Sequence, residues 1–101
     1  MIAEFIFKED GEDERILVHK TKYRDGKLAI TSATVYGEPF GTLSVNTPHE
    51  LEEDEFVVNH DTTQIGWDKY YMQTGVFEDT GKRVDYGWVS NQPVWRLKGG
   101  E

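Results

Sequence analysis

The chain has 101 residues, of which 37% are hydrophobic and 13% aromatic, and its formal net charge at pH 7 is −8. A chain of this length predicts one domain, here residues 1–101 with a frayed tail at 98–101, and its aromatic content is too high for a disordered protein. The absence of cysteine excludes disulfides and thiolate metal sites and favours a reducing, cytoplasmic environment. No signal peptide or membrane-spanning segment is expected.

The negative charge is concentrated in two acidic segments, residues 9–14 (EDGEDE) and residues 50–55 (ELEEDE). Together they hold ten of the 19 acidic residues, so the rest of the chain is nearly neutral, with nine acidic and eleven basic residues. Direct binding to nucleic acid or to an anionic membrane is therefore not expected, because a cationic surface that could neutralise phosphates is missing.

The first half of the chain alternates apolar and polar residues with the period of β-strands. It predicts strands at residues 3–7, 15–23, 27–36 and 40–46, with Asp25-Gly26 as a hairpin turn. Four such strands in succession predict an antiparallel meander. The two acidic segments come after the first and the fourth strand, so we expect them at opposite ends of the sheet.

The second half predicts one main helix at residues 61–75, with Asp61 and Gln64 as a capping box and Gly75 at its end. Gly66 inside this helix costs about 1 kcal/mol relative to alanine. The other segments predict a turn at 79–82, an interruption at Pro93, and strands at 56–59, 84–88 and 94–97. The expected fold class is α+β: an antiparallel sheet, made of the N-terminal meander and the C-terminal strands, with one main α-helix packed against it.

Neither metal binding nor catalysis is indicated by the residue spacings. His19, His49 and His60 match no compact metal motif, and neither acidic segment continues as a calcium-binding loop. The sequence contains no nucleophile elbow, phosphate-binding loop or dinucleotide fingerprint. We therefore predict no catalytic residue, no metal and no cofactor, and we do not expect an enzyme.

Aromatic residues gather in the last third of the chain, and two interpretations stay open. They form the core between helix and sheet, or some of them are exposed as a protein-binding patch, since Trp and Tyr dominate interface hot spots. The carboxylates are likewise either solvating or functional. The candidate partner-binding residues are Glu50, Glu52, Glu53, Asp54, Glu55, Trp67, Tyr71 and Trp88.

Three stretches, YRDGKLAI, YGEPFGTLSVN and LEEDEFVVNHD, resemble a family of small acidic proteins from bacteria, phages and mobile elements that is catalogued as a domain of unknown function. The resemblance spans residues 23–97 and departs from the family at residues 61–64, where DTTQ replaces an Asn-Glu helix start. It implies an intracellular protein of phage or plasmid origin. It brings no catalytic residues, and it implies that ELEEDE is a turn of the family.

The favoured hypothesis is a non-enzymatic binding or accessory protein of a phage or mobile element that acts through contacts with a protein partner. Acidic loops would speed the encounter with a basic partner. One alternative is a DNA mimic that inhibits a nucleic-acid-binding enzyme, which requires carboxylates strung along one surface. Another is a small-ligand-binding regulatory domain, which requires a pocket of roughly 300–1,000 Å³.

Overall fold

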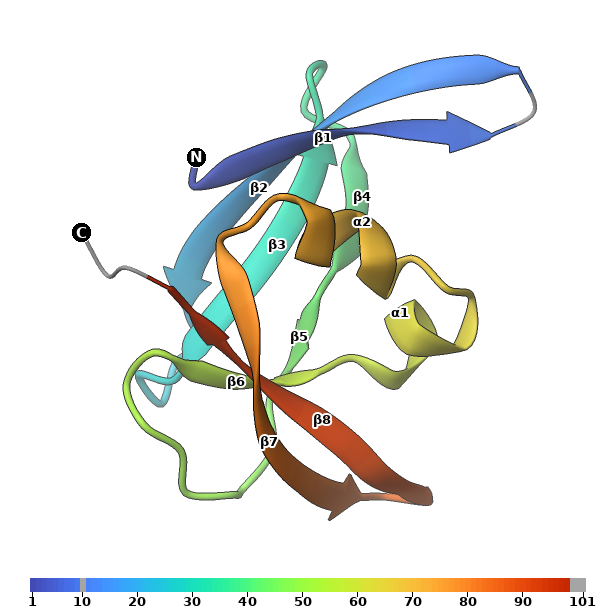
Figure 1. The fold of residues 1–101 in the computed structure, drawn as a ribbon. Helices are drawn as coiled ribbons and strands as arrows, with labels where there is room; N and C mark the ends of the chain where they lie inside the picture. Colours follow the sequence, from blue (N-terminus) through green and yellow to red (C-terminus); the bar gives the residue numbers. More distant parts are fainter. Residues whose placement is uncertain (10, 99–101) are drawn as a thin grey trace.

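The computed structural model describes residues 1–9 and 11–98, which form two four-stranded antiparallel sheets and two short helices (Figure 1). The N-terminal sheet has the order β1-β2-β3-β4, with β1 at Ala3–Glu9, β2 at Glu12–Lys22, β3 at Leu28–Thr34 and β4 at Pro39–Thr42. The C-terminal sheet has the order β5-β6-β8-β7, with β5 at Ser44–Val45, β6 at Glu55–Val58, β7 at Phe77–Tyr86 and β8 at Val89–Leu97.

The sheet-rich α+β class and the N-terminal order of strands are confirmed, but the single strand predicted at residues 40–46 is wrong. The chain leaves the N-terminal sheet at Thr42 and enters the C-terminal sheet at Ser44. Leu43 lies between them and is fully buried. Its backbone amide donates to the Ile30 carbonyl of β3 at 2.9 Å, and its carbonyl accepts from the Asn59 backbone amide, just after β6, at 2.7 Å. Burial of this one side chain accompanies the change of sheet.

The prediction of one main helix is met only in part, because two short helices occupy its place. They are α1 at His60–Gln64 and α2 at Asp68–Gln73. Gly66 separates them with a φ of +79°, which a continuous helix does not allow. The start of α1 is capped by Asn59, whose side chain accepts from the Asp61 amide at 3.0 Å, so the expected capping box is not used.

The C-terminal hairpin is longer than the sequence predicts. The expected turn at residues 79–82 is a bulge within β7, where the register with β8 shifts between Asp79 and Arg83. Pro93 does not interrupt β8, because it pairs with Arg83 next to that bulge. The predicted strand at 84–88 ends at Tyr86 instead, and the chain turns at Gly87 and Trp88.

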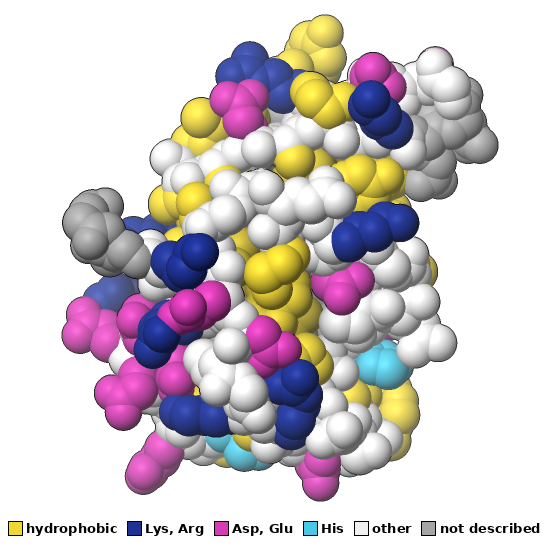
Figure 2. Space-filling view, in the orientation of Figure 1, with side chains coloured by type: hydrophobic (Ala, Val, Ile, Leu, Met, Phe, Trp, Pro, Cys, Tyr) yellow, Lys and Arg dark blue, Asp and Glu magenta, His cyan; other side chains and the backbone are white. Residues whose placement is uncertain are grey.

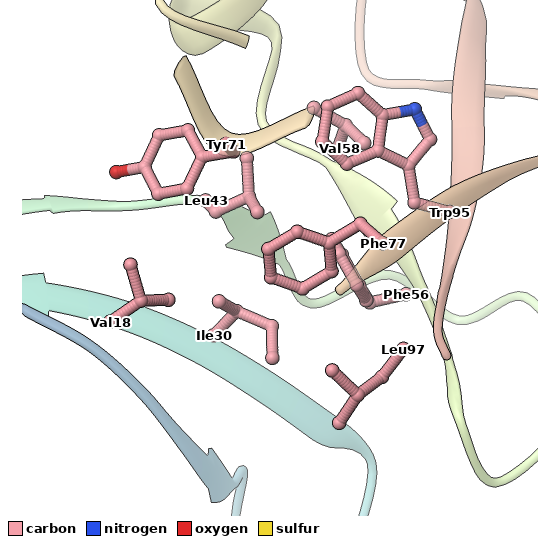
Figure 3. Close-up of a cluster of buried hydrophobic side chains, with 9 residues drawn as sticks. All are labelled: Val18, Ile30, Leu43, Phe56, Val58, Tyr71, Phe77, Trp95 and Leu97. Carbon is pink, nitrogen blue, oxygen red and sulfur yellow. The ribbon is translucent and has the colours of Figure 1, made fainter. Parts of the chain in front are cut away.

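Side chains from both sheets and from α2 point toward one another and form one hydrophobic core (Figure 3). Phe56 is central to it, with its ring 5.6 Å from that of Phe77 and 6.4 Å from that of Trp95. The core consists of Val18, Ile30, Leu43, Phe56, Val58, Tyr71, Phe77, Trp95 and Leu97.

The two acidic segments lie at opposite ends of the molecule, although not at the two ends of one sheet as predicted. In Figure 1 the ends of β1 and β2 that adjoin the first segment are at the upper right, and the loop before β6, which belongs to the other sheet, is at the lower left. Of the predicted frayed tail, residues 99–101 lie outside the described part, while the Lys98 amide donates to the Val76 carbonyl at 2.7 Å. Neither described helix has the length and apolar character needed to cross a membrane.

Candidate functional site

Residues 50–54 of the second acidic segment lie in the connection between β5 and β6, residues 46–54, which we call the acidic loop, and Glu55 begins β6. Lys27, half-buried on the neighbouring sheet, donates from its ammonium to the Thr47 carbonyl and, at 3.0 Å, to the His49 carbonyl. At the other end of the loop, the Asp54 carbonyl accepts from the Leu97 amide at 2.9 Å. The loop is therefore fixed to both sheets.

Glu55 is not an exposed carboxylate, which corrects the expectation of a solvated run. Its residue is only 4% exposed, and Lys82 donates to both carboxylate oxygens at 2.9 Å. The Glu52 amide donates to the same carboxylate at 2.9 Å. Burial acts to raise the pKa of Glu55, but these hydrogen bonds and the charge of Lys82 outweigh it and hold the pKa below the ordinary 4.5.

The other carboxylates of the segment face solvent. Glu50, Glu52 and Glu53 are exposed and Asp54 is half-buried. Glu52, Glu53 and Asp54 line a groove of about 730 Å³, whose other lining residues are Lys20, Thr21, Lys22, Leu28 and Leu97. Two lysines thus share this groove with three acidic residues, and the negative surface is interrupted beside the loop.

One of the candidate aromatic residues, Tyr71, is part of the buried core, and a second, Trp67, lies in a half-buried aromatic cluster beside it. Tyr71 is 2% exposed, and its hydroxyl forms a 2.8 Å hydrogen bond with the Ser32 hydroxyl. Burial raises the pKa of the Tyr71 phenol, and the bond to Ser32 only partly opposes this. Trp67 is half-buried and stacks on Phe40 with 4.7 Å between ring centroids. The structure favours the core interpretation for Tyr71, while Trp67 stays partly exposed on an aromatic stack.

Trp88 is the exception, with 93% of its surface exposed. It occupies the tip of the β7–β8 hairpin, where Tyr86 pairs with Val89 and only Gly87 and Trp88 form the turn. Gly87 has a φ of +56°, as expected when glycine takes the first place of a tight hairpin turn. The turn thus presents the indole outward.

The hairpin that carries Trp88 is held to the body of the protein. The Tyr86 hydroxyl accepts from the His60 amide at 3.0 Å, and the buried side chain of Gln92 donates to the Val58 carbonyl at 2.9 Å. Nearer the tip, the Asp85 carboxylate accepts a hydrogen bond from the backbone amide of Asn91 at 2.8 Å. Trp88 is therefore displayed by an ordered element and is not on a long loop.

A second groove, which no sequence pattern indicated, lies between α2 and the β7–β8 hairpin and has a volume of about 560 Å³. Figure 2 shows hydrophobic side chains in the middle of this face, with acidic and basic side chains on either side. Two of its lining residues, Arg83 and Asp79, form an ion pair with 2.9 Å between the guanidinium nitrogen and the carboxylate oxygen. The lining residues are Asp68, Lys69, Met72, Gln73, Asp79, Arg83, Pro93 and Trp95. The proximity of Met72 to Pro93 depends on the fold, so no local pattern could have revealed this groove.

The candidate residues therefore fall into separate places: the anchored acidic loop with the start of β6, the buried Tyr71, the half-buried Trp67 and the exposed hairpin tip. His19, His49 and His60 lie on β2, on the acidic loop and on α1. No family model, no curated protein and no solved structure matches this chain. The resemblance to the domain family of unknown function stays a prediction, and only the geometry bears on function.

Proposed function

We propose that this is a non-enzymatic binding protein that acts through protein–protein contacts, with Trp88 as its apolar anchor. The observation that carries the proposal is the 93% exposure of Trp88 on an anchored two-residue turn. Burying a large apolar side chain stabilises a fold by about 2 kcal/mol or more, so the exposed indole contributes little to folding. Tryptophan is enriched among the residues that dominate binding energy at protein interfaces.

The negative charge of the protein favours a partner with a basic surface. Glu50, Glu52 and Glu53 are exposed on the acidic loop, which lies toward the same lower end of Figure 1 as the tip of the β7–β8 hairpin. The chain carries a formal net charge of −8. Exposed carboxylates accelerate encounter with a cationic surface and make association sensitive to salt. Trp88 would then supply affinity and the acidic loop the rate of encounter.

The charge layout supports this proposal over a DNA mimic. A mimic needs a continuous row of carboxylates, since duplex DNA carries one charge per ~1.7 Å of its axis. Here the two acidic segments lie at opposite ends of the molecule, and Lys20 and Lys22 line a groove with residues of the acidic loop.

The proposal is tested by affinity capture from a bacterial lysate with quantitative mass spectrometry. We expect W88A to capture the partner proteins of the wild type at least ~10-fold less efficiently, as for a hot-spot residue. Y36A is the matched control, because Tyr36 is also an aromatic side chain on a turn and is 84% exposed. If W88A and Y36A retain the same proteins as the wild type, Trp88 is not the anchor.

The acidic half of the proposal has its own test. The triple variant E50Q/E52Q/E53Q should capture less of the same proteins at low salt, and the difference should disappear when salt screens the charges. Unchanged capture at low salt would limit the contact to the hairpin tip.

A second candidate, a small-ligand site, is favoured by the groove of about 560 Å³ between α2 and the hairpin. Met72, Pro93 and Trp95 give it an apolar surface, with Lys69 and Arg83 beside it. A thermal-shift screen of nucleotides and metabolites tests it, and R83A should abolish any stabilisation that is found.

Association with a phage or mobile element, and a cytoplasmic location, are part of the proposal and are supported only by the resemblance of residues 23–97. Phage or plasmid genes beside the coding sequence would support it. A neighbourhood of housekeeping genes would contradict it.

A further inference from the structure

The free edges of the two sheets differ in how well they could accept another strand. β4 is four residues long, begins with Pro39 and has a register shift opposite Ser32 and Ala33, while β5 has only two residues. β7 contains the bulge at residues 79–83. Proline, shortness and bulges are the features by which natural sheets prevent edge-to-edge pairing.

β1 is neither short, bulged nor interrupted by proline, and the charges that it carries on this edge, Glu4 and Lys8, are of opposite sign. It pairs with β2 over all seven of its residues in one unbroken register, and it contains neither proline nor glycine. Among residues 1–9 and 11–98, no strand pairs with its other side. β1 is thus the only long, regular edge in the described part of the fold.

The outward groups of this edge can be assigned. In an antiparallel pair, alternate residues direct their backbone groups toward the neighbouring strand and the others direct them outward. The Lys8 carbonyl accepts from the Tyr70 hydroxyl at 3.3 Å, which places Lys8 in the outward set, together with Ile6 and Glu4 two and four residues earlier. The side chains of these three residues are exposed, because Phe5 and Phe7 pack inward on aromatic rings.

We propose that β1 pairs antiparallel with β1 of a second copy of this chain, about a two-fold axis at Ile6. This register places Glu4 opposite Lys8 of the other copy, twice, and the two Ile6 side chains opposite each other. Ile6 is 45% exposed in the single chain, and the contact covers it. The same patch meets itself, which is the isologous arrangement of two-fold dimers.

The identity of the occupant is set by the order of charges along the strand. When residues 4–8, E-F-I-F-K, pair antiparallel with the same segment of a second copy, the acidic end of one strand faces the basic end of the other and the apolar centres meet. A foreign peptide would need the same order by coincidence, whereas a second copy always supplies it. Glu4 already accepts from Arg15 of its own β2 at 3.0 Å, and the Lys8 of the second copy approaches it from the free side.

Sedimentation equilibrium in about 0.15 M salt, over about 1 to 500 µM protein, tests the proposal. The wild type should approach twice its mass of 11.7 kDa as concentration rises. E4K and K8E each place like charges opposite one another at both ends, and each should raise the dissociation constant at least ~10-fold. The double variant E4K/K8E restores the complementary order and should return the dissociation constant to within a few-fold of the wild type.

Controls separate pairing from folding. E12K makes the same change of charge on the inner strand of the same hairpin and should dimerise like the wild type, and circular dichroism checks every variant. Because the chain has no cysteine, I6C takes one nitroxide label, which should show strong dipolar broadening in the dimer, while a label at T21C should not.

Three results overturn the proposal. They are a wild type that stays at 11.7 kDa at the highest concentration, a dimer that E4K leaves unchanged, and a dimer of labelled I6C without broadening. A wild type that stays monomeric excludes self-association. Either of the other two results would mean that the chain dimerises through a surface other than β1.

Discussion

The two acidic segments have nearly the same composition but different structural roles. On the β1–β2 hairpin, Glu12, Asp13 and Glu14 are all exposed at the end of a projecting ribbon. In the second segment, Glu55 is buried against Lys82 and the preceding loop is tied to both sheets.

The difference comes from the strand into which each segment leads. Residues 55–58 form β6, in which all four residues are buried, so the last carboxylate of the segment is carried into the interior with its strand. A buried carboxylate requires a cation or hydrogen-bond donors, and Lys82 and the Glu52 amide supply them. The first segment leads into an exposed part of β2. A run of acidic residues is therefore not one kind of site.

The largest effect is expected at the buried pair. E55Q loses the charge-assisted bonds with Lys82 and should lower the free energy of unfolding by about 1–2 kcal/mol. K82M should cost more, because it leaves a carboxylate inside without its cation, whereas in E55Q the half-exposed Lys82 can turn to water. Urea denaturation at pH 7 measures both. An equal or smaller loss in K82M would mean that Glu55 is well solvated.

The anchor of the acidic loop comes next. K27M removes the donor to the Thr47 and His49 carbonyls and should cost about 1–2 kcal/mol. Amide hydrogen exchange should accelerate in residues 46–54 of this variant. K20M is the control, since Lys20 is exposed and lines the groove beside the loop. Equal exchange in both variants would contradict the anchoring role of Lys27.

The sequence predicts well the features that depend on neighbouring residues. Alternation located the first three strands, and Asp25-Gly26 forms the expected turn, in which the Asp25 carboxylate accepts from the Lys27 backbone amide at 3.0 Å. The burial of Glu55 was not predictable, because its partner Lys82 is 27 residues away in the chain. The exposure of Trp88 likewise depends on where β7 ends, which periodicity did not place correctly.

A third, smaller effect is the loss of stability in acid. The pKa of Glu55 is lower in the folded chain than its ordinary 4.5, so its contribution to stability is present above pH 4.5 and is lost as the pH falls through the folded pKa. The difference in free energy of unfolding between the wild type and E55Q should therefore shrink below pH 4.5. A difference that stays constant to lower pH would contradict the pairing.

The smallest effect is expected in the first segment. E12Q/E14Q removes two exposed charges from the β1–β2 hairpin and should change the free energy of unfolding by less than about 0.5 kcal/mol. A slight gain is expected, because neighbouring carboxylates repel one another. Thermal unfolding checks this. A loss as large as that of E55Q would show that both segments are structural.

The central claim is that one carboxylate of the second segment is an internal anchor. An NMR titration of the Glu55 carboxyl carbon tests it most directly, in the wild type and in K82M. We expect a midpoint below 4.5 in the wild type and a higher one in K82M, because the Lys82 ammonium stabilises the ionised carboxylate. A wild-type midpoint at or above 4.5, unchanged by K82M, would contradict it.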